Sequence, residues 1–469
     1  MLKERGADVA FDYIADNFDP LRHVYPFLDE KIYAPLVGRP LSEIPCPCGE
    51  HPSYSEHFLQ PFLRTLEELE IRVTPFRADE IYKSGRMNPQ IIASLEGTER
   101  IGAILQEHTG RRVEEGWSPF NPLCEACGRI TKARLTGFSA AQETVSYACE
   151  CGFAGARPMA GGGKLTWRID WPARWNLFGV TVEPFGKDHA SRGGSYDTGV
   201  PIVREIFRGE PPFPIAYEWI SLKGRGDMSS SKGNVLSIAR MLEVVPPEVL
   251  RYLIVRTRPQ RSIPFDPGLP LLALVDEYDD LQSSTRDERS LSLSRASGGG
   301  SVGVPFRHLV NVVQIAGGDE AETARVLSRN GYTEIDPATL SRRIAYSKQW
   351  LAAFAPEEMR FSVRPEVPVE AAALDPERKA FLADLAGRLT ESMDAEAVHK
   401  AVYASAAQFP SARPAELFEA IYLSLLGQPR GPRAGWFLTL LGLDFCARRF
   451  REAAALQAPA PGGGPVPSS

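Results

Sequence analysis

Long apolar runs are missing from this chain of 469 residues. No stretch reaches the roughly 20 apolar residues that a membrane-spanning helix needs, and the N-terminus lacks the apolar segment of a secretory signal peptide. An excess of positive charge is missing too, because 53 Lys and Arg stand against 59 Asp and Glu, for a net charge of −6. A protein that binds nucleic acid over much of its surface is usually basic, so any RNA site must be a local patch.

Cysteine is scarce, with seven in the chain, and most of these are grouped. Grouped cysteines without a signal peptide favour metal binding in a reducing compartment over disulfides, which predicts a cytoplasmic protein. The remaining composition, with 43% hydrophobic and 24% charged residues, is ordinary for a globular protein. This length predicts about two to four domains.

The first part of the chain alternates strand-like and helical patterns. Strand-like segments are predicted at 9–13, 71–73, 180–182 and 213–220. The last of these is almost wholly apolar, so we expect it to be a buried strand. Alternating β and α signals predict a parallel sheet with helices on both faces.

The composition changes near residue 285. Residues 285–301 are rich in Ser, Arg and Gly and predict a linker. Beyond them apolar residues recur at helical spacing, first from Phe306 to Val313 and again in a segment that starts near Pro414 and stops at Gly427. We therefore expect an all-helical domain after the linker.

Four cysteines form two close pairs: Cys124 with Cys127, and Cys149 with Cys151. A hairpin-length spacer separates the pairs, so four thiolates could surround one tetrahedral zinc with Zn–S distances near ~2.3 Å. The alternative is four unconnected buried thiols. Four protein ligands leave no open position on the metal, so this spacing predicts a structural zinc.

A second group comprises Cys46, Cys48, His51 and His57. These side chains could form another tetrahedral site, or they could belong to a surface turn with incidental His and Cys. Both interpretations stay open, because Cys-x-Cys spacing strains a shared metal.

Residues 228–234 read Met-Ser-Ser-Ser-Lys-Gly-Asn and follow the apolar segment 213–220. Hydroxyls, backbone N–H groups and a lysine can close over a triphosphate and neutralise developing charge. The three serines alone would instead favour a solvated loop. A P-loop at 161–164 is excluded, because Pro158 stands where its first glycine belongs and Leu165 replaces the required Ser or Thr.

A Gly-Lys-Asp-His turn at residues 186–189 follows a strand-like segment. Turns at the carboxyl ends of strands are where ligands bind in open α/β sheets. Asp188 could orient the ring of His189, or bind a ribose or an ammonium group. Trp167 and Tyr217 are candidates for the walls of a pocket that holds an alkyl chain with a cation near an aromatic face, although either could be an ordinary core residue.

Together these motifs resemble the class I (archaeal-type) lysyl-tRNA synthetases. The loop at 228–234 resembles the KMSKS loop of class I synthetases in the variant of this family, and similar segments are 164–175, 184–197 and 431–437. The match runs from about residue 8 to 452. The resemblance implies an α/β fold, with a class I Rossmann-like parallel sheet and a zinc-binding insertion, followed by an all-α anticodon-binding domain. It also implies a lysine–tRNA ligase that uses lysine, ATP with Mg²⁺, and tRNA(Lys).

The resemblance implies roles for individual residues. The lysine pocket would contain Trp167, Asp188, His189 and Tyr217. Apart from the resemblance, the aromatic residues Trp350 and Trp436 of the helical domain could stack anticodon bases, or they could all be core residues. ATP would be bound by Gly186, Met228, Ser230, Ser231 and Lys232, with Ser229, Ser230, Ser231 and Lys232 stabilising the reacting phosphates.

The expected domain organisation combines the patterns and the resemblance. Its segments are 1–119 for the first, truncated part of the Rossmann-like catalytic domain with a connective segment, 120–155 for a zinc-ribbon-like insertion, 156–284 for the second part with the KMSKS-like loop, 285–301 for a linker, 302–455 for the helical anticodon-binding domain and 456–469 for a disordered tail.

Three features depart from the family pattern. The HIGH-type motif of the first strand–helix turn is not found, and residues 2–6 resemble the last turn of a helix, so we expect that motif upstream of Met1 and expect this chain alone to be inactive. Asp227 takes the place of the loop's usual first lysine. Residues 46–51 read Cys-Pro-Cys-Gly-Glu-His where the family typically has Asp-Pro-Phe-Gly-Cys-His, so a second zinc would use altered ligands.

Two other functions remain open at this point. One is a non-catalytic tRNA-binding protein built from the remnants of a synthetase. The other is a glutamyl-type class I synthetase, which shares the architecture. Amino-acid-dependent pyrophosphate exchange separates the three, because it would depend on lysine, depend on glutamate, or be absent.

Overall fold

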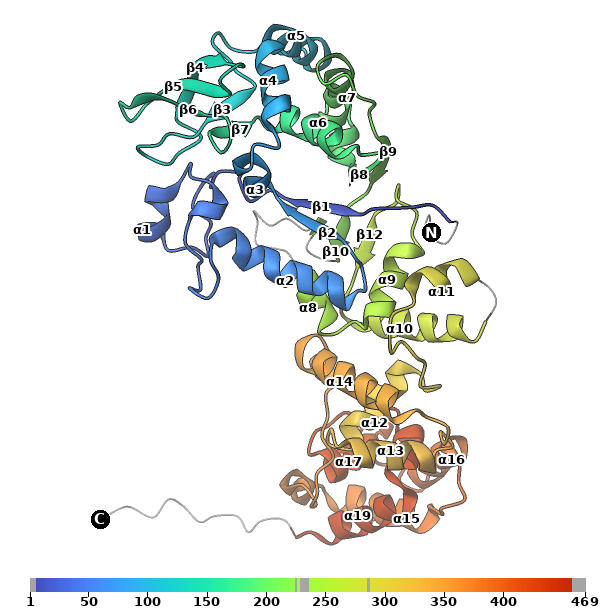
Figure 1. Ribbon diagram of the computed structural model, residues 1–469. Coiled ribbons are helices and arrows are strands. Elements are labelled where there is room, and N and C mark those ends of the chain that lie inside the picture. Colours follow the sequence, from blue (N-terminus) through green and yellow to red (C-terminus); the bar gives the residue numbers. More distant parts are fainter. Residues whose placement is uncertain (1–5, 224–225, 228–235, 285–286, 458–469) are drawn as a thin grey trace, which may run out of the picture. The chain divides into compact units, whose positions relative to one another are not determined.

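The computed structural model describes residues 6–223, 226–227, 236–284 and 287–457, which form two compact units (Figure 1). The first unit comprises the residues up to 242 together with 251–265, and the second comprises 243–250 and the chain from 266 onward. Among the described residues no helix has the length and apolar character needed to cross a membrane.

Parallel strand pairs run through the first unit. Each pair is joined through helices, as parallel strands require, since their connection must return along the sheet. The pairs are β1 (Asp12–Ala15) with β2 (Thr74–Arg77), β8 (Val182–Gly186) with β9 (Phe213–Tyr217), and β10 (Ile220–Leu222) with β12 (Ile263–Phe265); β11 (Gly226–Asp227) adds an antiparallel strand to β10.

The predicted α/β pattern is therefore present, but the described strands form separate short sheets rather than one continuous sheet. The connecting helices are α1 (Glu30–Tyr33) and α2 (Tyr54–Glu68) between β1 and β2, α7 (Ser195–Glu205) between β8 and β9, and α8 (Ile238–Leu242) and α9 (Pro247–Val255) between β10 and β12.

The segment 213–220 differs from the expected buried strand. It is split into β9 and β10, which belong to different sheets. Phe213 is 67% exposed and Tyr217 is 46% exposed. Among the described strands β9 pairs only with β8, and four of its five side chains are exposed, while Ala216 packs against the core. An apolar run indicates burial only where another layer packs on it, and the sequence does not reveal that layer.

Several helices of the first unit surround a large hydrophobic core. Its largest buried side chains include Tyr82, Phe120 and Trp175. The helices around it are α3 (Ala78–Lys83), α4 (Asn88–Glu96), α5 (Thr98–Thr109) and α6 (Trp167–Phe178), with the short pair β3 (Phe120–Pro122) and β7 (Gly163–Leu165) (Figure 1).

A buried carboxylate lies inside this core. Asp170 is fully buried on the first turn of α6. Its Oδ1 accepts a hydrogen bond of 2.6 Å from the hydroxyl of Tyr82, and its Oδ2 lies 2.5 Å from Arg174 Nη2 and 3.2 Å from Lys164 Nζ. Burial alone would raise the pKa of Asp170, but the charges of Arg174 and Lys164 outweigh burial and hold this pKa below its usual value.

The same two cations reach the turn that follows β1. Arg174 Nη2 lies 2.6 Å from Asp16 Oδ1, and Lys164 Nζ pairs with Asp19. Lys164 belongs to β7 and Arg174 to α6, so the ionic network joins three segments that are far apart in the sequence. A buried pair is strongly destabilising to break, because one charge is then left uncompensated.

An antiparallel ribbon interrupts the α/β pattern where the insertion was expected. It contains β4 (Ala133–Ser139), β5 (Thr144–Cys149) and β6 (Ala154–Pro158), in the order β4-β5-β6. Tyr147 is buried in it, and its hydroxyl accepts a hydrogen bond of 2.9 Å from the backbone N–H of Glu125.

The second unit is helical from residue 266 onward in its described part. The predicted apolar face from Phe306 to Val313 is confirmed, because Phe306, Leu309, Val310 and Val313 are all buried. Its helices are α10 (Leu269–Gln282), α11 (Glu288–Ser294), α12 (Phe306–Ile315), α13 (Glu320–Arg329), α14 (Pro337–Ala353), α15 (Pro376–Arg388), α16 (Ala395–Ala406), α17 (Pro414–Leu426), α18 (Ala434–Leu441) and α19 (Leu443–Ala455).

The ends of α17 lie where the sequence predicts them, since the helix begins at Pro414 and Gly427 follows it with φ of 70°. The predicted linker 285–301 differs, because it contains α11. Asp287 caps this helix by accepting a 3.0 Å hydrogen bond from Ser290 N–H, and the hydroxyl of Ser294 donates to Ser290 O at 2.6 Å. Serines that bond their own helix can be buried, so a Ser-rich composition does not by itself predict a linker.

Replacing Asp170 tests the ionic network. We expect Asp170→Asn to lower the unfolding free energy of the first unit by about 3–5 kcal/mol, because Lys164 and Arg174 lose a buried counter-charge. Asp8→Asn, at an exposed position, is the control and should change little. The measurement is urea denaturation followed by circular dichroism.

The stability that Asp170 provides depends on pH in a defined direction. The folded pKa of Asp170 is lowered, so its stabilisation is complete above the unfolded-chain value of about 3.9 and is lost as the pH falls through the folded pKa. The stability difference between wild type and Asp170→Asn should therefore shrink at acid pH. An equal difference at pH 7 and pH 2 would contradict the assignment.

Candidate active site and metal centres

The ends of β8 and β9 bring the predicted binding residues together. The parallel register places Gly186 opposite Tyr217, and the short helix η4 (Lys187–Ala190) continues from β8. Gly186 leaves room for the carboxylate of Asp188, because a Cβ at position 186 would lie 2.7 Å from Asp188 Oδ1 and would displace that exposed side chain. The turn 186–189 therefore lies at the carboxyl ends of two parallel strands, where the sequence predicts a site.

Aromatic rings form one wall beside this turn. The ring centroids of Trp167 and Trp171 lie 5.6 Å apart in a stacked arrangement, and His189 lies 6.0 Å from Trp167 and 5.4 Å from Trp171. Trp167 Nε1 donates a hydrogen bond of 3.3 Å to Ser195 Oγ. These contacts fix the indole ring of Trp167 relative to the loop that carries His189.

Polar groups accompany the rings. Asp188 Oδ2 lies 3.6 Å from His189 Nε2, and Asp188 is exposed. Burial raises the pKa of Tyr217, and the negative charge of Asp188 raises it further. The phenol of Tyr217 therefore stays neutral at physiological pH. Aromatic faces beside a carboxylate suit a ligand that ends in an ammonium group.

Two residues of this region were missed by sequence reasoning. Trp171 lies four positions after Trp167 on α6, a spacing that brings both rings to one side of the helix and could have revealed it. Ser195 begins α7, and its contact with Trp167 spans 28 positions, so no local pattern predicts it. The predicted phosphate-binding residues Met228, Ser229, Ser230, Ser231 and Lys232 lie outside the described part of the chain.

The four cysteines of the insertion converge. Their sulfur atoms lie within 4.8 Å of one another, with 3.7 Å from Cys124 to Cys151 and 3.7 Å from Cys127 to Cys149. Tetrahedral bonds of about 2.3 Å place neighbouring sulfurs roughly 3.8 Å apart, so the set fits one zinc. Burial raises the pKa of Cys149 to about 12, so metal binding would release its proton.

The second cysteine and histidine group also converges. Cys46 and Cys48 lie 3.2 Å apart at their sulfurs, and His57 Nδ1 lies 3.5 Å from Cys46 Sγ and 3.2 Å from Cys48 Sγ. His51 Nδ1 lies 3.5 Å and 3.4 Å from the same two sulfurs. The sulfur–nitrogen separations are slightly short of the roughly 3.6 Å expected on tetrahedral zinc, and the sulfur–sulfur distance is clearly shorter than the roughly 3.8 Å expected there, so the four atoms converge more tightly than a zinc ion would hold them.

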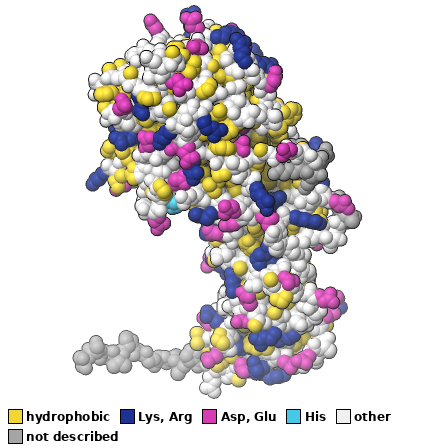
Figure 2. Space-filling model, viewed as in Figure 1, with side chains coloured by type: hydrophobic (Ala, Val, Ile, Leu, Met, Phe, Trp, Pro, Cys, Tyr) yellow, Lys and Arg dark blue, Asp and Glu magenta, His cyan; other side chains and the backbone are white. Residues whose placement is uncertain are grey.

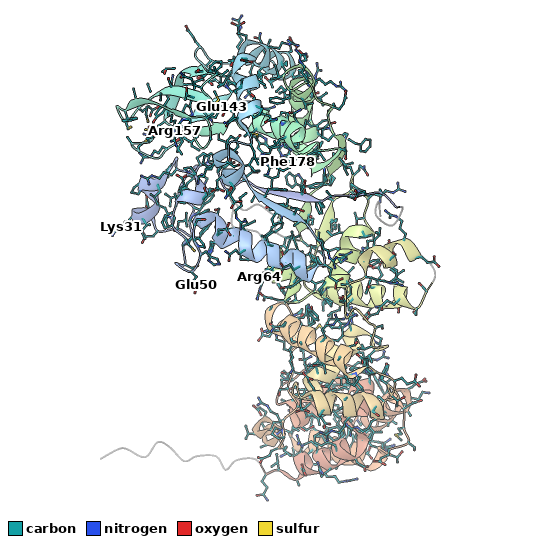
Figure 3. All side chains as sticks on the ribbon, viewed as in Figure 1. Lys31, Glu50, Arg64, Glu143, Arg157 and Phe178 are labelled. Atoms are coloured by element: carbon teal, nitrogen blue, oxygen red, sulfur yellow. The ribbon has the colours of Figure 1, made fainter. Side chains whose placement is uncertain are left out.

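The two metal-capable groups are separate. Glu50, in the loop that carries the second group, lies apart from Arg157 on β6 of the ribbon in Figure 3. Each group therefore supports a different segment: the ribbon in one case, and the connection between β1 and α2 in the other.

The helical unit contains a cavity of about 1090 Å³. Its lining mixes aromatic rings and charges of both signs. It includes Arg307, His308, Arg433 and Trp436, and also the carboxylates of Asp276, Glu358 and Glu396. The imidazole of His308 lies against the indole of Trp436, with ring centroids 4.8 Å apart, and burial lowers the pKa of His308. The segment 431–436 expected from the sequence thus borders a cavity large enough for a flipped base.

Trp350, however, cannot stack a base. Its side chain is fully buried, and its Nε1 donates a hydrogen bond of 2.8 Å to the carbonyl of Pro267. The prediction for Trp350 is wrong, because helical spacing does not reveal which aromatic side chains face the core.

The comparisons with known proteins agree with this architecture. The family model described as tRNA synthetases class I (K) matches residues 1–296. A lysine–tRNA ligase of Methanosarcina barkeri is 49% identical over 96% of this chain and 89% of its own length, and one of Archaeoglobus fulgidus is 46% identical over 96% and 90%. The chain thus has the α/β organisation of class I tRNA synthetases, and it belongs to the class I lysyl-tRNA synthetase family.

Proposed function

We propose that this protein is a lysine–tRNA ligase, which activates lysine with ATP and transfers it to tRNA(Lys). The curated relatives that carry this name match nearly the whole chain. The observation in the site that supports it is the turn 186–189 beside the rings of Trp167 and Trp171, which provides aromatic faces and a carboxylate for an alkylammonium group.

Lysine activation requires the protein to position lysine and ATP more than to form covalent bonds with them. A carboxylate oxygen of lysine bonds to the α-phosphorus of ATP, and the bond to the outgoing oxygen breaks, so pyrophosphate leaves with the electron pair. The hydroxyls and the ammonium group of residues 229–232 would neutralise the charge that develops on the phosphates. Mg²⁺ bound with ATP would add positive charge there. A ribose hydroxyl of the tRNA then attacks the lysyl carbonyl, and AMP leaves.

The site favours lysine over glutamate. A glutamate substrate would bring a second carboxylate close to Asp188, and like charges repel. The extended lysine side chain can instead lie along Trp167, with its ammonium group near Asp188 and the phenol of Tyr217. A glutamyl-type activity therefore has less support from the side chains of this turn.

Amino-acid-dependent pyrophosphate exchange, measured with tRNA present, tests the function. The assay compares these 469 residues with a chain extended upstream in frame, and in whichever of them exchange is measured we expect it to depend on lysine and not on glutamate. His189→Ala should raise the KM for lysine about tenfold or more and change the KM for ATP much less, because the ring borders the amino-acid site. His23→Ala, an exposed histidine of the same unit, is the matched control.

Three results would contradict this proposal. Exchange that depends on glutamate would show a glutamyl-type enzyme. RNA binding without exchange, in the extended chain as well as in the 469 residues, would show a non-catalytic remnant. An unchanged lysine KM in His189→Ala, with lysine-dependent exchange intact, would place the lysine site elsewhere.

We further propose that both cysteine-containing groups hold structural zinc. The supporting observation is that each set supplies four ligand atoms within 4.8 Å of one another and leaves no position for a substrate. Zinc would stabilise the ribbon and the β1–α2 connection, since ligand binding energy in such sites is also folding energy.

Metal analysis should find two zinc ions per chain. Cys127→Ala and Cys48→Ala should each retain one, with a lower melting temperature. Cys446→Ala is the control, because this cysteine is buried in the helical unit, away from either group, and should retain both. One zinc in wild type that persists in Cys48→Ala would identify the second group as an ordinary turn.

The helical unit is proposed to bind the anticodon arm of tRNA(Lys). Support comes from the cavity beside Trp436, which combines a ring for stacking with the cations Arg307 and Arg433. The lining also contains the carboxylates of Asp276, Glu358 and Glu396, so the proposal depends on the position of the two arginines beside the indole and not on a net positive charge of the cavity.

We expect Arg433→Ala in the full chain to weaken binding of tRNA(Lys) several-fold, and to reduce the preference over a tRNA(Lys) transcript with an altered anticodon. Arg325→Ala is the control, because its side chain is 71% exposed on α13 and pairs with Glu322. Filter binding at two salt concentrations measures both effects. A wild-type chain that binds the two transcripts equally would refute the anticodon role.

A further inference from the structure

A second cavity in the first unit is lined mainly by arginines. Its volume is about 430 Å³, and Arg111, Arg112, Arg168 and Arg192 account for four of its nine lining residues, with His108 beside them. None of the nine is Asp or Glu. Figure 2 shows dark blue side chains over the part of the first unit where Figure 1 places α5 and α7.

These guanidinium groups have little compensation from carboxylates among the described residues, apart from the effect of the Arg192 charge on the pKa of Asp197. None of the four arginines forms an ion pair among the described residues. The nearby acids are engaged elsewhere: Arg100 on α5 lies 2.6 Å from Glu205 and 3.0 Å from Glu107. The next two glutamates, at 114 and 115, are exposed and do not line the cavity. Four like charges around one cavity favour an anionic ligand.

The walls of the cavity are held in place. Arg168 Nη1 donates to Gly193 O at 3.0 Å and to Thr198 Oγ1 at 3.2 Å. Asp197 Oδ2 accepts from Gly193 N–H at 2.8 Å and lies 3.2 Å from His108 Nδ1, so its charge is used to join the loop to α5. The hydrogen bond from Gly193 lowers the pKa of Asp197, which stays ionised at neutral pH.

Gly193 permits this close approach. It has φ of 73°, and a Cβ there would lie 2.8 Å from the carbonyl oxygen of His108. The end of α5 and the loop before α7 therefore touch through backbone atoms. The wall formed by Arg168 and Gly193 is therefore held by hydrogen bonds, whereas Arg111, Arg112 and Arg192 are exposed at the rim of the cavity.

The cavity adjoins the proposed lysine site. Trp167 borders that site, and Arg168 follows it on α6. The loop from His189 to Ser195 contributes its two ends to the lysine site, while Arg192 and Gly193, between them, line the cavity. A ligand of the cavity would thus lie next to the place where the 3′ end of a tRNA must arrive to receive lysine.

We propose that this cavity binds the phosphate backbone of the tRNA acceptor arm, close to its 3′ end. This inference rests on the proposed function. Guanidinium groups match phosphate oxygens in bidentate geometry, and such contacts fix the register of the nucleic acid. The lining has no aromatic ring other than the imidazole of His108, so it suits a phosphate chain better than a nucleotide base.

Kinetics with the full chain test the inference. Arg112→Ala and Arg192→Ala should each raise the KM for tRNA about threefold to tenfold at physiological salt, and should leave the KM for lysine within about twofold. The slope of log affinity against log salt concentration should fall by roughly 0.7–0.9 for each phosphate that the variant no longer neutralises. Arg112→Lys, which keeps the charge but not the bidentate geometry, should keep the salt slope of wild type and lose less affinity than Arg112→Ala.

Arg204→Ala is the matched control, because this arginine is exposed on α7 of the same unit and does not line the cavity. It should change neither the KM nor the slope. An unchanged tRNA KM in both cavity variants would overturn the inference. So would an equal rise in the tRNA KM of Arg204→Ala, since the effect would then be that of general surface charge.

Binding to RNA pieces identifies the part of the ligand concerned. A short RNA helix with the acceptor-arm sequence and its single-stranded end should bind the variants more weakly than wild type, whereas an anticodon stem–loop should bind all of them equally. Weaker binding of the stem–loop instead would overturn the inference. Competition by millimolar inorganic phosphate as strong as that by the acceptor helix would also overturn it, because the cavity would then be a small-anion site.

The experiments can refute the ligase function and the acceptor-arm site independently of each other. If wild type binds the acceptor helix through these arginines but neither it nor the chain extended upstream shows lysine-dependent exchange, the ligase function fails and the acceptor-arm site stands as an RNA-binding site. If exchange is present and the variants are unaffected, only the acceptor-arm site fails.

Discussion

The buried carboxylate of Asp170 is the constraint on which the first unit depends. A charge inside an apolar core is tolerated only when opposite charges and hydrogen bonds surround it, and here Tyr82, Lys164 and Arg174 do so. The two cations also reach the acidic turn after β1. One ionic network therefore holds a strand, a helix and the returning end of the insertion in a single arrangement.

This network fixes the start of α6, and α6 separates two surfaces of different chemistry. Trp167 and Trp171 stack against His189 on one side, where a neutral aromatic wall meets the carboxylate of Asp188. Arg168 points to the loop at Gly193 on the other. Adjacent residues of a helix lie about 100° apart around its axis, so one helical turn can serve an amino-acid site and a cationic cavity together.

The two metal-capable groups show which metal-ligand clusters residue spacing alone can predict. The pairs Cys124–Cys127 and Cys149–Cys151 are close in sequence, and a hairpin brings the pairs together as the spacing predicts. For Cys46, Cys48, His51 and His57 the sequence left two interpretations open, and the convergence of four ligand atoms favours a metal site over an incidental turn. Local motifs are predictable because their geometry needs few long-range contacts.

The sequence by itself determined the alternation of strands and helices, the buried face of α12, the ends of α17 and the position of the turn 186–189. Tertiary structure alone decided that β9 is exposed, that Trp350 is buried, and that Ser195 supports Trp167. It also brought arginines from α6 and two separate loops around one cavity. The physical reason is that periodicity and spacing report neighbours along one element, whereas burial and charge clustering depend on which distant elements pack together.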